Sequence, residues 1–95
     1  MGEARLAVLC KVLPGMFAGE RLAIIEDSAG KRIASLLVDA SLVKTETEPK
    51  KDVPVLGRVA VLPLHGSEQV TVELPVQSME SGFVISVPSA KLALF

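Results

Sequence analysis

The sequence predicts an all-β fold of six or seven short, mostly antiparallel strands, arranged as a small barrel or sandwich. Three observations support this prediction. Apolar residues recur at every second position, proline or glycine separates such segments at short intervals, and no segment has a clear helical period. A chain of 95 residues is too short for two independent cores, so we expect residues 1–95 to form a single all-β domain.

The first predicted strand covers residues 4–13, where side chains alternate cleanly and indicate one fully buried face. Pro14 and Gly15 follow it and suit the central positions of a type II turn, since glycine accepts the positive φ that this turn requires. Residues 20–27 then have an apolar centre on both faces, which is typical of a short interior strand.

The strongest turn signal of the chain is Asp27–Gly30. Aspartate favours the first position of a type I turn, and Gly30 suits the left-handed position that closes a hairpin. Residues 31–45 are ambiguous, because Ala34, Leu36 and Val38 share a face at period two, whereas a helical stripe also fits. We favour the strand, because a hairpin turn precedes it.

The second half of the chain begins with a charged stretch, residues 45–54, which predicts a solvated, mobile loop. Beyond this loop, three segments of β-forming residues each run into a proline, at Pro63, Pro75 and Pro88. The clearest of the strands is 69–76, whose apolar side chains share one face. The tail 89–95 predicts either one short helical turn, capped by Ser89, or a final strand.

Several predicted strands are apolar on both faces, most clearly residues 22–25, 33–38 and 59–64. Burying one valine or leucine side chain contributes about 1.5–3 kcal/mol, so a second apolar face left in water forgoes a large stabilisation. An open apolar strand also invites edge-to-edge aggregation. We therefore expect an oligomer, in the first place a homodimer, whose interface buries the second face.

The charge balance argues against two classes of partner. Ten lysine and arginine residues stand against eleven aspartate and glutamate residues, and the isoelectric point is near 5.8. A dedicated binder of nucleic acid or of an anionic membrane needs an excess of basic residues on one face. Tryptophan and tyrosine are absent, so aromatic platforms for stacking bases are lacking. We expect no nucleic-acid partner and no membrane partner.

Cys10 is the single cysteine, so an intramolecular disulfide or a thiolate zinc cluster is excluded. It lies in a short apolar run, where a thiol behaves as a small buried hydrophobe. That run is too short for a signal peptide, and no apolar segment approaches the roughly 18 residues of a membrane-spanning helix. These features predict a reducing, cytoplasmic setting.

The sequence offers little for catalysis. A nucleophilic mechanism needs a base beside a hydroxyl or thiol, and His65 is the single histidine. We interpret His65 as a turn residue that faces solvent, so a small enzyme that uses it is the least favoured hypothesis. The carboxylates and this one imidazole lack the spacing of a metal site. We therefore predict no catalytic residue, no metal and no cofactor.

Two groups of residues are candidate contacts for a partner or a ligand. Met16 and Phe17 stand in a turn between two glycines, where they either project as an apolar knob or fold back to plug one end of the barrel. We favour the plug. Lys31 and Arg32, together with Arg21, are candidate anchors for a small apolar or anionic molecule.

The leading functional hypothesis is a non-catalytic small β-domain that self-associates and works through protein–protein contacts. It depends on the strands that are apolar on both faces and on the small number of residues suited to catalysis. The alternative is a β-barrel that binds a small molecule through the basic anchor described above.

Overall fold

The computed structural model describes residues 5–66 and 69–95, and within these ranges it confirms the all-β prediction. The two helical segments are short 3-10 turns, and none of the described residues belongs to a helix long and apolar enough to cross a membrane. The described strands are β1 (Leu6–Pro14), β2 (Glu20–Glu26), β3 (Arg32–Asp39), β4 (Val43–Thr45), β5 (Val55–Ala60), β6 (Leu62–Gly66), β7 (Gln69–Ser78), β8 (Gly82–Pro88) and β9 (Leu92–Leu94).

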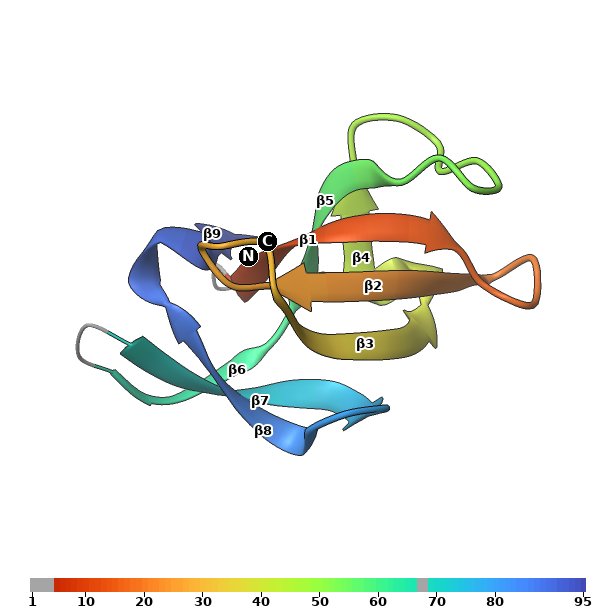
Figure 1. The fold of residues 1–95 in the computed structure, drawn as a ribbon. Coiled ribbons are helices and arrows are strands. Elements are labelled where there is room, and N and C mark those ends of the chain that lie inside the picture. Colours follow the sequence, from red (N-terminus) through yellow and green to blue (C-terminus); the bar gives the residue numbers. More distant parts are fainter. Residues whose placement is uncertain (1–4, 67–68) are drawn as a thin grey trace.

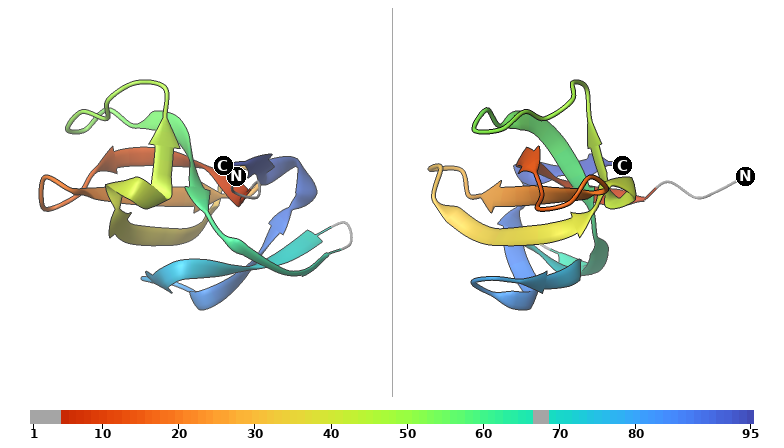
Figure 2. Two further views of the ribbon diagram at one scale, coloured as in Figure 1. Left: turned by 180° about the vertical axis from the view of Figure 1, so that it is seen from behind. Right: turned by 90° about the vertical axis from the view of Figure 1, so that its right-hand side faces the viewer.

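The strands form two antiparallel sheets (Figure 1). The large sheet has the order β3-β2-β1-β5-β4, and the small sheet has the order β6-β7-β8. Along β1, one edge pairs with β5, while β2 and β9 share the other edge: β2 pairs with residues 11–14 and β9 with residues 6–8. The small sheet lies beside β3 in both views of Figure 2, and the sheets do not close into a barrel. The arrangement therefore agrees with the sandwich alternative.

The core lies between the two sheets and follows from the alternation of each strand. In β1, Val8, Cys10 and Val12 are buried, whereas Leu9 and Lys11 between them are exposed, as the sequence predicts. Both sheets contribute to one continuous cluster of buried side chains, which includes Val8, Val12, Ile25, Leu36, Val38, Val59, Val72, Leu74, Ile85 and Val87.

The β2–β3 hairpin forms as predicted. Gly30 adopts a φ of 83°, and its N–H donates to the Asp27 carbonyl at 3.1 Å. The Asp27 carboxylate accepts from the N–H groups of Ala29 and Lys31, each at 2.9 Å. The ambiguous segment 31–45 is a strand up to Asp39, then a 3-10 turn over Ala40–Leu42, then the short strand β4. The predicted continuous apolar face therefore ends where Asp39 caps the 3-10 turn.

The predicted type II turn at Pro14 and Gly15 is wrong. Among the described glycines, Gly30 and Gly82 have a positive φ, and Gly15 does not. Pro14 instead ends β1, and the N–H of Gly15 donates to the Glu20 carbonyl at 2.9 Å to close a loop over residues 15–19. Glycine is required here for space, because a Cβ at position 15 would lie 2.6 Å from Cγ of Glu20.

The tail combines the two predicted alternatives, since a 3-10 turn over Ser89–Lys91 precedes β9. The prediction that Ser89 caps the turn is wrong: Pro88 is the capping residue, and no side chain completes the cap. In β7, the pairing with β8 is interrupted between Glu73 and Ser78, around Pro75, because proline has no N–H to donate to a neighbouring strand.

The charged loop 45–54 contains a tight turn, in which Lys50 bridges to Val53 and Asp52 has a φ of 60°. Glu48 of this loop forms an ion pair with Arg21 at 3.0 Å. The mobility expected of the loop stays a prediction.

The turn between β7 and β8 covers the free edge of β3, which has β2 as its one neighbour in the large sheet. The N–H of Met79 donates to the Ser35 carbonyl at 3.0 Å, and the Ser81 hydroxyl donates to the Ile33 carbonyl at 2.8 Å. The Glu80 carboxylate accepts from both the N–H and the hydroxyl of Ser35, each at 2.7 Å. These bonds satisfy backbone groups that would otherwise recruit another strand.

Replacing Glu80 with alanine is expected to lower the free energy of unfolding by about 2 kcal/mol, because the N–H and hydroxyl of buried Ser35 lose a charged acceptor. Urea unfolding at neutral pH measures this change. The control is Glu46→Ala, which removes an exposed carboxylate from the 45–54 loop and should change stability by less than about 0.5 kcal/mol. Equal losses in both variants would show that Glu80 does not stabilise the edge of β3.

The contribution of Glu80 to the free energy of unfolding is expected to depend on pH. The hydrogen bond from the Ser35 hydroxyl, helped by the Ser35 N–H and by Arg32, lowers the pKa of Glu80 below its ordinary value. A carboxyl whose pKa is lower in the folded chain than in the unfolded chain stabilises fully above the unfolded pKa of about 4.3 and loses this effect as pH falls through the folded pKa. The difference between wild type and Glu80→Ala should therefore shrink on acidification. A difference in unfolding free energy between the two proteins that stays constant down to about pH 2 would contradict this pH dependence.

Candidate functional site

The face of the large sheet that points away from the core, here called the outer face, is defined by register. Leu9, Lys11 and Leu13 of β1 alternate with the buried residues of that strand. Ile24 of β2 and Leu56 of β5 both lie opposite Lys11, on either side of it. Directly opposed residues of neighbouring strands point to the same face. The outer face also includes Leu22, Leu37, Arg58 and Lys44.

The outer face carries a patch of large aliphatic side chains. Leu56 is 79% exposed and Leu9 is 41% exposed, while the other members are half-buried. None of these side chains belongs to the cluster that packs between the sheets. The patch realises the second apolar face expected for residues 22–25 and 33–38, and its members are Leu9, Leu13, Leu22, Ile24, Leu37 and Leu56.

The outer face is also hollowed, because two strands share one edge of β1. Pairing with β9 ends at Val8 and pairing with β2 begins at Lys11, so the edge is open between them. A hollow of about 190 Å³ lies there, lined by Leu9, Ile24 and Leu56 and bordered by Glu26 and Lys91. Two further hollows, of about 360 and 220 Å³, adjoin Leu13 with Leu22 and Leu9 with Leu56.

Opposite charges lie on opposite sides of this patch. The acidic side is that of β2 and β3, where Glu20, Glu26 and Asp39 outnumber Arg32, and the basic side is that of β5 and β4, where Arg58 and Lys44 outnumber Glu46. Glu26 pairs with Lys11 at 3.1 Å across the strand boundary. The N–H of Ser41 donates to Asp39, and this hydrogen bond lowers the pKa of the Asp39 carboxyl.

The basic side is held around one aromatic ring. The Nζ of Lys44 lies 4.6 Å from the centre of the Phe95 ring, and the Arg5 guanidinium lies 5.3 Å from it. The Nε of Arg58 donates to the Phe95 carbonyl at 3.2 Å. Cations are attracted to the electron-rich face of an aromatic ring, so Phe95 holds Lys44 and Arg5 close together.

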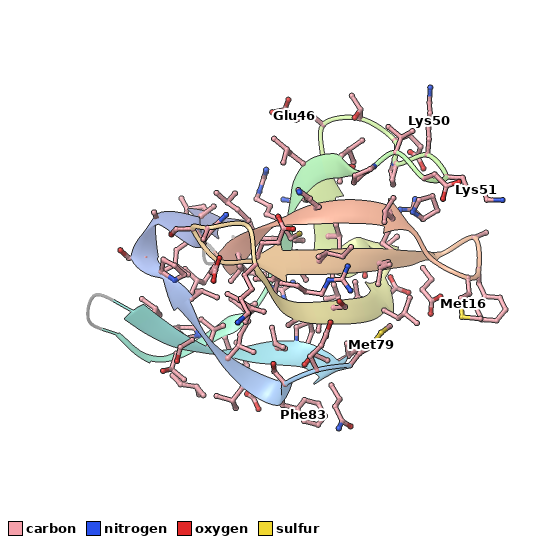
Figure 3. All side chains as sticks on the ribbon, in the orientation of Figure 1. Met16, Glu46, Lys50, Lys51, Met79 and Phe83 are labelled. Atoms are coloured by element: carbon pink, nitrogen blue, oxygen red, sulfur yellow. The ribbon has the colours of Figure 1, made fainter. Side chains whose placement is uncertain are left out.

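Met16 and Phe17 project from the molecule, and the prediction that they plug one end of the fold is wrong. Their exposed fractions are 76% and 72%, and Figure 3 shows Met16 at the tip of the β1–β2 loop, pointing away from both sheets. The cause is local, because Glu20 closes the loop on itself: its carboxylate accepts from the Met16 N–H at 2.8 Å, and its N–H donates to the Phe17 carbonyl. Their role as partner contacts stays a prediction.

The three basic residues considered as a ligand anchor are not brought together. Arg21 lies at the start of β2, whereas Lys31 and Arg32 follow its other end. A strand rises about 3.3 Å per residue, so the length of β2 separates Arg21 from Lys31 and Arg32. Arg21 is occupied by the Ala18 and Glu20 carbonyls and by Glu48, and Arg32 lies 3.9 Å from Glu80. Lys31 is exposed at the hairpin turn.

The residues considered for chemistry are not assembled into a site in the part of the chain that the structure describes. Burial raises the pKa of the Cys10 thiol to about 12, so this cysteine is a protonated core residue. The interpretation of His65 as a turn residue is wrong, because it lies in β6 opposite Thr71, and its side chain falls outside what the structure describes. No three potential metal ligands gather within residues 5–66 and 69–95.

Sequence reasoning did not identify Leu56 and Arg58, because it placed no strand before residue 59. The alternation of Val55, Gly57 and Val59 is the signal of β5, and the glycine interrupts its hydrophobic pattern.

Comparisons of the chain with protein-family models, with curated proteins and with solved structures yield no match.

Proposed function

We propose that this chain is a non-catalytic β-domain that self-associates through the outer face, as a homodimer, and works through protein–protein contacts. The observation that supports the proposal is the apolar patch, in which Leu56 stands 79% exposed at the rim of a hollow. Covering one such side chain contributes about 1.5–3 kcal/mol. A contiguous patch of this kind typically marks an interaction surface.

The proposal includes a protein partner and a reducing, cytoplasmic compartment. The balance of ten basic and eleven acidic side chains supports a protein partner over nucleic acid or a charged membrane surface. The buried, protonated Cys10 supports a reducing, cytoplasmic compartment.

The direct test replaces Leu56 with glutamate and measures mass by light scattering over a hundredfold range of concentration. Wild type is expected to be a dimer, and Leu56→Glu is expected to raise the dissociation constant by about thirtyfold or more, because a central interface residue typically contributes about 2 kcal/mol or more. The side chain of Leu56 is exposed, so this variant should keep the fold of the single chain, which circular dichroism verifies.

The matched control is Leu62→Glu, which places the same charge at a leucine that is 59% exposed on the small sheet. It should leave the dissociation constant unchanged. Wild type that stays monomeric across the whole range would overturn the proposal, and equal weakening by both variants would move the interface away from the outer face.

A further inference from the structure

The outer face has a symmetry that becomes visible when its residues are placed relative to β1. Ile24 and Leu56 flank Lys11, on β2 and β5 respectively. Next along the same two strands come Glu26 and Arg58, and Arg58 lies opposite Leu9, which shares a hollow with Glu26. Ile24 and Leu56 are therefore equivalent apolar positions on the two sides of β1, whereas Glu26 and Arg58 are equivalent positions of opposite charge.

A two-fold axis parallel to β1 would exchange these two sides. It would bring Ile24 of one copy onto Leu56 of the other, and the acidic side onto the basic side. A two-fold axis perpendicular to β1 would instead bring the acidic side of one copy onto the acidic side of the other, and like charges in contact disfavour association. The outer face is therefore complementary to the outer face of a second copy when the two-fold axis is parallel to β1.

We propose that two copies of this chain pack through their outer faces about a two-fold axis that runs along β1. Ile24 packs on Leu56 of the partner subunit, and Glu26 lies against Arg58 of the partner subunit. This inference rests on the proposed self-association and adds the orientation of the two copies. Sheets that pack face to face with nearly aligned strands are a common arrangement, with the sheets about 10 Å apart.

The charges of one copy support this arrangement. Glu26 already pairs with Lys11, whereas the ion pairs found among the described residues include neither Arg58 nor Lys44 of the basic side. Glu46 lines a hollow together with Arg58 but forms no ion pair with it there. The acidic side of a second copy would supply the missing counter-charge.

The decisive experiment is a charge exchange between two variants, followed by light scattering and native mass spectrometry. Arg58→Glu alone and Glu26→Lys alone should each raise the homodimer dissociation constant by roughly tenfold or more, because each places like charges in contact twice. A mixture of the two variants should form a heterodimer with nearly wild-type affinity, because every contact then joins opposite charges. The matched control is Lys31→Glu, a charge reversal at the β2–β3 turn, which should leave the dimer unchanged.

The outcomes separate this inference from the proposed function. Homodimers of both variants as stable as wild type, or a mixture with no preference for the heterodimer, would overturn the orientation and leave self-association intact. Wild type that remains monomeric would overturn both. Circular dichroism of each variant verifies that the strands are formed.

Cross-linking provides a second test that does not depend on charge. Within one chain, Ile24 and Leu56 are separated by two strand spacings, about 10 Å, which is too far for a disulfide. A mixture of Ile24→Cys and Leu56→Cys should form the mixed intermolecular disulfide faster than Leu56→Cys forms a disulfide with itself. Equal or slower formation of the mixed disulfide would overturn the orientation.

Discussion

Replacing Gly57 with alanine is expected to lower the free energy of unfolding by about 3 kcal/mol, since forced overpacking of a tight site typically costs about 1–3 kcal/mol and here the obstacle is backbone. Gly57 lies in β5, between Cys10 of β1 and Thr45 of β4. A Cβ at this position would lie 2.6 Å from the Lys44 carbonyl oxygen and 2.7 Å from Cγ2 of Thr45. Relieving this steric overlap therefore requires β4 to move away from β5.

Urea denaturation at one fixed protein concentration measures the effect of Gly57→Ala. The control is Gly19→Ala, because a Cβ there meets nothing within 4 Å and the residue does not have a positive φ. We expect that variant to remain within about 0.5 kcal/mol of wild type. If Gly57→Ala is as stable as wild type, then β4 is not held tightly against β5.

Replacing Leu36 with alanine is expected to cost about 3 kcal/mol, because a leucine buried in a packed core loses both its transfer free energy and the contacts around the resulting cavity. Leu36 is fully buried in the middle of β3, opposite Ala23 of β2. Both residues belong to the buried core cluster. The small neighbour has no rotamers with which to close the cavity.

Thermal unfolding followed by circular dichroism measures this loss, and each kcal/mol should lower the transition temperature by about 4–8 °C in a domain of this size. Leu62→Ala is the control, because it makes the same truncation at a leucine that is 59% exposed. A shift for Leu36→Ala no larger than that of Leu62→Ala would contradict the packing described for β3.

The features that could be predicted from the sequence are those with local causes. The period of two in β1 and the pair of Asp27 and Gly30 depend on residues adjacent in the chain, and both predictions are confirmed. The strand over residues 32–39 is confirmed as well. Local signals also indicated that several strands are apolar on both faces.

The features that could not be predicted depend on contacts between distant residues. Nothing near Ser35 indicates that Glu80 will accept its N–H, because these residues come together only when the small sheet packs beside β3. The outward position of Met16 and Phe17 depends on the loop closure by Glu20. The outer face could be expected to exist, but its residues could not be named, because β5 was not recognised before residue 59.

The shared edge of β1 has a consequence for the time course of folding. Leu6 pairs with Leu94, at opposite ends of the described chain, while Lys11 on the same strand pairs with Ile24 nearby. One half of this edge can therefore form early, whereas the other half must wait until the C-terminal strand is available. Proteins dominated by such distant pairings fold slowly, typically in milliseconds to seconds. During synthesis, β1 and β2 are made before β9, so the β1–β2 hairpin can form before β9 pairs with β1.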